Sequence, residues 1–112
     1  MRNAFPLAAI FLAMTATAFA QGDLPAGAIK RGSLANAKLT QDAKLGVAAK
    51  VATMGCSQPS AVEPFVVAMP SGAVGRRHWT ELWIVSGCGK KYPVKIEFDE
   101  DGPDAANWTI PR

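Results

Sequence analysis

Residues 79–89 read WTELWIVSGCG, and this stretch decides the fold because large apolar side chains alternate along it as they do along a β-strand. The expected strand extends over residues 76–87. One face carries Trp79, Glu81, Trp83 and Val85, and the other carries Thr80, Leu82, Ile84, Ser86 and Cys88. Because Cys88 is expected to bond to a cysteine at the end of a helix, we expect its face to pack on that helix. The tryptophans then lie on the opposite face, unless a bulge near Gly87 reverses the alternation.

Two other segments have the pattern of strands. Residues 63–69 form a short apolar run bounded by prolines, and residues 92–98 alternate apolar and polar side chains. Pro93 has no N–H to donate, which indicates an edge strand or an unpaired side of that strand. An acidic turn at 99–104 precedes a short terminal strand at 107–110.

A helix is predicted over residues 41–54, before the strands. Thr40 is a good N-cap, and apolar side chains then recur near helical spacing. Gly46 weakens the helix slightly, and Gly55 supplies the residue that ends it. The fold class expected is therefore α+β, with one helix packed on a three- or four-stranded antiparallel meander.

Residues 1–20, MRNAFPLAAIFLAMTATAFA, have the three parts of a secretory signal peptide. Arg2 supplies the positive charge, an apolar run follows, and Ala18 and Ala20 are the small residues of a cleavage site. The continuous apolar portion is shorter than the roughly 20 residues that span a membrane, so we expect cleavage rather than anchoring. The sequence thus predicts a chain exported to the periplasm or secreted, with no transmembrane segment after cleavage.

Cys56 and Cys88 are the only two cysteines, and an even pair in an exported chain predicts a disulfide. Closing the loop between them stabilises the fold by roughly 3 to 4 kcal/mol on the chain-entropy model. That is of the same order as the whole stability expected of so small a domain.

The length predicts one domain. Residues 21–36 are rich in glycine and proline and predict a flexible lead-in without a stable element, and residues 37–112 form the single domain. The formal net charge of +3 is too small to indicate a nucleic acid partner. The oligomeric state is not indicated by the sequence.

No catalytic or cofactor-binding constellation is expected. His78 is the only histidine, and its neighbours Arg76 and Arg77 are cationic and do not pair it for proton transfer. The acidic turn at 99–104 lacks the spacing of a calcium loop and is expected to be solvated. We therefore predict that the protein is not an enzyme and holds no metal or cofactor.

Trp79 and Trp83 are candidate binding residues, because they share a strand face that the expected helix leaves uncovered. Exposed indoles suit contacts with sugars, peptides or proteins. The alternative is that residues 21–36 or the C-terminal segment fold over the two tryptophans as a second small core.

Arg76, Arg77 and His78 are a second set of candidate binding residues. Together with Lys90 and Lys91 they form a cationic patch if the two strand ends meet, although such short clusters are more often solvated ends. The loop at residues 71–77 is also the natural inserting element of an inhibitor, if the disulfide tethers it.

The pattern W-x-E-x-W-x-V-x-x-C-G at residues 79–89, after a cysteine that follows a helix, resembles small exported bacterial (periplasmic) proteins of unknown function. The resemblance covers about residues 40–110 and implies a bacterial envelope location and the disulfide, but no activity. The function expected is a non-catalytic envelope protein that binds a partner protein or a cell-wall component. The alternative is a secreted inhibitor of an enzyme that uses the loop at 71–77.

Overall fold

The structure is a computed structural model that describes residues 23–112. The signal peptide expected at residues 1–20 lies outside the described residues, as do the first two residues of the expected lead-in. None of the helices within residues 23–112 has the length and apolar character that crossing a membrane requires.

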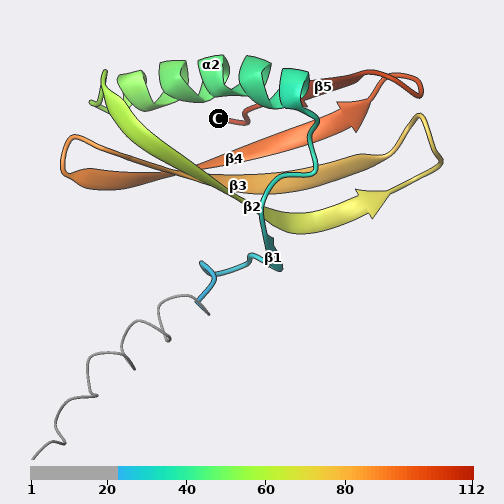
Figure 1. Cartoon of the computed structure of the whole chain (residues 1–112), viewed down its shortest axis with the longest axis horizontal. Coiled ribbons are helices and arrows are strands. Elements are labelled where there is room, and N and C mark those ends of the chain that lie inside the picture. The colour runs from blue at the N-terminus through green and yellow to red at the C-terminus, as the bar shows by residue number, and fades with distance from the viewer. Residues whose placement is uncertain (1–22) are drawn as a thin grey trace, which may run out of the picture.

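The chain forms one helix and a five-stranded antiparallel sheet, so the α+β class is confirmed (Figure 1). The elements in chain order are β1 (Lys30–Arg31), α2 (Ala37–Thr53), β2 (Pro59–Ser71), β3 (His78–Gly87), β4 (Lys90–Glu100) and β5 (Ala106–Thr109). The strands lie side by side in the same order as in the chain, and α2 lies across one face of the sheet. Five strands are present where three or four were expected.

The additional strand, β1, comes from the lead-in, for which no stable element was expected. Its two residues pair with Phe65 and Val66 of β2. The flanking N–H groups of Ile29 and Gly32 donate to carbonyls of β2 at 2.8 Å each. The sequence does not predict β1 because two residues are too few to show a periodicity. They form a strand because their backbone groups pair with the edge of β2.

The helix α2 begins four residues earlier than the sequence predicts. Its N-cap is Asn36, whose side-chain oxygen accepts a hydrogen bond from the Leu39 N–H at 2.8 Å, so Thr40 lies inside the first turn. The C-terminal end agrees with the prediction, because Gly55 follows with a φ of 108°.

The face of the sheet that packs on α2 is the opposite of the one that the sequence predicts. Trp79, Trp83 and Val85 are buried in one core with Ala43, Val47 and Val51 of the helix, whereas Leu82 and Ile84 lie on the outer face. The expectation was wrong because Cys88 is not a strand residue. It lies in the two-residue turn between β3 and β4, with a φ of 53°, so its side chain does not follow the alternation of β3.

The predicted disulfide is present between Cys56 and Cys88, whose Cα atoms are 5.8 Å apart. It joins the C-terminal end of α2 to the turn between β3 and β4. A Cβ atom at Gly87 would lie 2.8 Å from Pro59 Cα and 3.1 Å from Cys56 Sγ, so only glycine allows this close approach.

Candidate functional site

The W-x-E-x-W pattern forms a buried polar cluster around Glu81. This carboxylate is 0% exposed and accepts four hydrogen bonds. The indole N–H groups of Trp79 and Trp83 donate to different oxygens, Oε2 at 2.8 Å and Oε1 at 2.7 Å. Oε2 also accepts from the Ser33 hydroxyl at 3.0 Å and from the Leu34 N–H at 2.8 Å. The cluster therefore ties the segment before α2 to the middle of the sheet.

This cluster removes the two tryptophans from the candidate surface. Both indoles are buried, and Trp79 stacks on Phe98 with ring centroids 5.0 Å apart. Neither expected arrangement is found, because the tryptophans are covered by α2 in the main core and not by a second small core of residues 21–36 or of the C-terminal segment. An exposed aromatic platform for sugars is thus not formed by Trp79 and Trp83.

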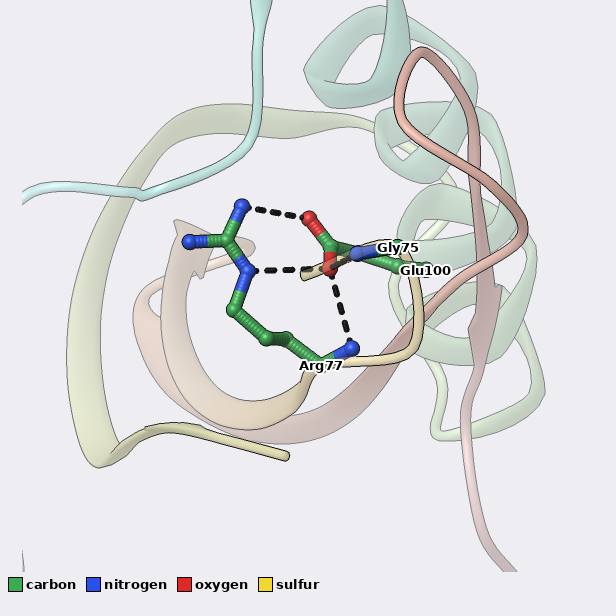
Figure 2. Close-up of polar contacts among 3 residues, drawn as sticks. All are labelled: Gly75, Arg77 and Glu100. Carbon is green, nitrogen blue, oxygen red and sulfur yellow. Dashed lines mark hydrogen bonds and ion pairs between the residues drawn. The ribbon is translucent and has the colours of Figure 1, made fainter. Parts of the chain in front are cut away.

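The site that remains is a clamp on the loop between β2 and β3 (Figure 2). The carboxylate of Glu100, at the end of β4, accepts hydrogen bonds from the backbone N–H groups of Gly75 and Arg77 at 2.9 Å each. It also accepts from the Arg77 guanidinium, through Nε at 2.9 Å and Nη2 at 2.7 Å. One carboxylate thereby fixes both the backbone and the side chain of the loop.

The clamp keeps both of its partners charged. The pKa of Glu100 is lowered from 4.5 to about 2. The largest cause is the side-chain hydrogen bond from Arg77, and the backbone N–H groups of Arg77 and Gly75 and the charge of Arg77 add to it. The same side-chain hydrogen bond raises the pKa of Arg77. At neutral pH the clamp is therefore a complete ion pair with two additional backbone donors.

Two loops are held together by this clamp. The Gly102 N–H, in the loop between β4 and β5, donates to the Gly75 carbonyl at 3.0 Å. We call residues 72–77 and 101–105 the loop pair. Residues 73–76 and 100–103 line a hollow of about 580 Å³, and Val74 in its wall is 76% exposed. The loop pair is thus one fixed end of the sheet with an exposed apolar side chain at its tip.

The two basic clusters do not meet. His78 pairs with Asp99 at one end of the β3–β4 ladder, whereas Lys90 pairs with Gly87 at the other end. A single cationic patch of Arg76, Arg77, His78, Lys90 and Lys91 is therefore not formed. Arg77 is engaged by Glu100, and Arg76 remains exposed in the loop pair.

A row of Ser71, His78 and Asp99 crosses β2, β3 and β4 on the outer face. His78 Nδ1 lies 3.5 Å from Asp99 Oδ1, and both side chains are more than half exposed. Acyl transfer requires a hydrogen bond between nucleophile and base in a site that excludes water. Within residues 23–112 no side-chain hydrogen bond joins Ser71 to His78, so the row supports no catalytic assignment. Among the same residues, no group of acidic, histidine or cysteine side chains could hold a metal ion.

Comparisons of this chain with models of protein families, with curated proteins and with solved structures found no match. The candidate site therefore stands on its own geometry. The sequence indicated the loop at 71–77 but not its tether, because Glu100 is only one of several acidic residues in the turn at 99–104. The signal that was available is the position of Arg77 and Glu100 at facing ends of two strands that pair.

Proposed function

We propose that this chain is a non-catalytic protein of the bacterial envelope, periplasmic or secreted, that binds a partner protein through the loop pair. The leader pattern at residues 1–20 and the disulfide both support export, because disulfides persist in oxidising compartments. The burial of Trp79 and Trp83 favours a protein partner over a cell-wall glycan.

The observation that carries this proposal is the Glu100 clamp. A loop that is ordered before binding loses less conformational entropy when it meets its partner. Here Glu100 fixes the backbone at Gly75 and Arg77, while Val74 and Arg76 remain exposed. An exposed apolar side chain beside an exposed cation, on a fixed loop, is suited to an apolar pocket with an acidic rim.

The second candidate function is inhibition of an enzyme through the same loop at residues 71–77. The projecting, clamped loop favours it, because a rigid loop can occupy a cleft without being reordered by the enzyme. The tether is different from the expected one. The disulfide lies at the opposite end of β3, and Glu100 holds the loop instead.

The test is a pull-down from periplasmic extract with the oxidised protein as bait. Val74→Asp should abolish capture of the partner, because it places a charge at the apolar tip. The matched control is Leu45→Asp, since Leu45 on α2 is 73% exposed and lies away from the loops. Equal capture by the wild-type protein and the Val74 variant would remove the loop pair from the contact.

The two candidate functions are separated by the identity of the captured protein. If it is an enzyme whose activity falls in proportion to added wild-type protein, and not to added Val74→Asp protein, the chain is an inhibitor. If its activity is unchanged at saturation, or it is not an enzyme, the chain is a binding module only.

A further inference from the structure

The loop between β2 and β3 carries two consecutive arginines, Arg76 and Arg77. Within residues 23–112 the other basic residues lie in α2 or in strands, except Arg112 at the C-terminal end. Exposed loops made of small residues are common sites of proteolytic cutting, and residues 71–75 read SGAVG. The Arg76 side chain is exposed and, among the described residues, takes part in no ion pair. An endopeptidase of the trypsin type, whose specificity pocket holds a carboxylate, would therefore find at Arg76 the side chain that it requires.

The backbone beside this side chain is not available to a protease. An enzyme that pairs with the backbone of a substrate needs an extended segment with free N–H and C=O groups. Here the Arg76 N–H donates to the Ala73 carbonyl at 2.8 Å, which closes a β-turn, and Gly75 has a φ of 91°. The N–H groups of Gly75 and Arg77 donate to Glu100 (Figure 2). Three consecutive N–H groups are thus occupied within the protein, so the segment must leave Glu100 and open its turn before it can be cut.

Glu100 is the contact on which this closed state depends. Its carboxylate accepts four hydrogen bonds from the loop, whereas the turn itself is closed by one. Apolar packing contributes little, because Val74 at the tip is 76% exposed. Glycines at 72 and 75 add no conformational restriction of their own. Without Glu100 the loop is therefore expected to open.

A cut after Arg76 would not separate the two halves of the protein. The bond lies between Cys56 and Cys88 in the sequence, so the disulfide joins the two fragments, and β2 and β3 remain paired. Hydrolysis consumes one water and leaves a carboxylate on Arg76 and an α-ammonium on Arg77. The Arg77 nitrogen already lies 2.9 Å from Glu100 Oε1, so the new ammonium stays on this carboxylate. The segment before the cut becomes a chain end.

We propose that the Arg76–Arg77 bond is a masked cleavage site for endopeptidases that cut after basic residues, and that Glu100 is the mask. The rate of cutting then follows the fraction of molecules in which the clamp is open. A cut removes the fixed tip of the loop pair and leaves the fold intact, so it ends binding through this site irreversibly. Only this last consequence rests on the proposed function.

The experiment is digestion of the oxidised protein by trypsin at neutral pH, followed by mass spectrometry before and after reduction. A loop cut adds the mass of one water before reduction and gives two fragments after it. We expect Glu100→Ala to be cut in the loop about tenfold faster than the wild-type protein, or more, because it loses charge-assisted hydrogen bonds. The matched control is Asp99→Ala, which should be cut at the wild-type rate, since Asp99 faces His78 and not the loop. Cuts in α2 and β4 report unfolding of the whole domain and should be absent from all three proteins.

Equal rates of loop cutting in the wild-type and Glu100→Ala proteins would overturn the proposal, as would equal acceleration by Asp99→Ala. Absence of loop cutting in both proteins would show that the bond is not a cleavage site. Cuts in α2 or β4 that appear together with the loop cut would assign the protection to the whole fold. Wild-type protein that has been cut in the loop should also lose capture in the pull-down. Unchanged capture would contradict the loss of binding, whereas the mask is judged by the cutting rates alone.

Discussion

At the scale of the residue, Glu81 is the side chain on which the arrangement of the core depends most. A carboxylate removed from water is destabilising unless its oxygens accept hydrogen bonds. Here four donors surround it, two of them indole N–H groups from its own strand. The W-x-E-x-W pattern is thus a structural motif, in which each residue is needed because of the other two.

Glu81→Gln should destabilise the fold by roughly 3 kcal/mol, because a buried donor left without an acceptor costs about 1–3 kcal/mol. Trp79 and Trp83 donate to different oxygens, so the amide nitrogen of glutamine must face one of them in either orientation. Urea unfolding followed by tryptophan fluorescence measures the change. Glu97→Gln, on the other face of the sheet, is the control and should lie within about 0.5 kcal/mol of wild type. Equal effects of the two substitutions would contradict the role of Glu81.

Gly46 is a second residue whose role depends on a distant neighbour. In an exposed helix, Gly→Ala stabilises by about 1 kcal/mol. Here a Cβ atom at Gly46 would overlap the indole ring of Trp108, from β5. We expect Gly46→Ala to lower the melting temperature of the wild-type protein. In a Trp108→Ala background, where the space is open, the same substitution should raise the melting temperature. Thermal unfolding of the four proteins of this cycle measures both signs. Stabilisation by Gly46→Ala alone would show that the contact is not tight.

At the scale of the element, the loops at the two ends of β3 are held by different means. The two-residue turn before β4 carries Cys88 and the disulfide, whereas the longer loop before β3 is held by Glu100. The ion pair of the clamp is partly exposed, but the backbone donors of Gly75 and Arg77 make the geometry specific. The loop is therefore ordered by electrostatics rather than by apolar packing.

The clamp should make the order of the loop pair dependent on pH below about 4.5. The pKa of Glu100 is lowered from 4.5 to about 2, so its stabilising contribution is complete above pH 4.5 and is lost as the pH falls through 2. The amide signals of Gly75 and Arg77 in NMR spectra should titrate with a midpoint near 2 and broaden below it. In Glu100→Gln this titration should be absent. A midpoint near 4.5 in the wild-type protein would contradict the clamp.

At the scale of the whole molecule, the helix layer is attached to the sheet at both of its ends. Glu81 binds Ser33 and Leu34 just before α2, and the disulfide holds Cys56 just after it. Between these ends the apolar side chains of α2 pack on the tryptophan face. A small core gains most from such attachments, because they restrict the unfolded chain or satisfy buried polar groups.

The double substitution Cys56→Ser and Cys88→Ser should lower the melting temperature by more than about 10 °C. The bond closes a loop with a sequence separation of 32, for which the chain-entropy model gives about 4 kcal/mol. In a domain of this size, 1 kcal/mol corresponds to about 4–8 °C. Calorimetry of the oxidised and substituted proteins measures the shift, and a thiol assay shows whether the wild-type protein is oxidised. Two free thiols in the native protein would contradict the bond.

The sequence by itself determined the features that depend on near neighbours in the chain. The alternation of residues 92–98 and the apolar spacing before Gly55 identified a strand and the helix, because backbone geometry sets those periods. The pair Cys56 and Cys88 determined the disulfide, because two cysteines allow a single pairing.

Tertiary structure alone decided which face of β3 is buried, what holds the loop at 71–77, and that the lead-in supplies β1. Alternation defines two faces of a strand but not which one meets the helix. The position of Cys88 was expected to identify that face, but Cys88 lies in a left-handed turn outside the strand. Arg77 and Glu100 are 23 residues apart, and Lys30 is still further from Val66. Such contacts leave no local periodicity, because they arise only when the strands have paired and brought distant hydrogen-bonding groups together.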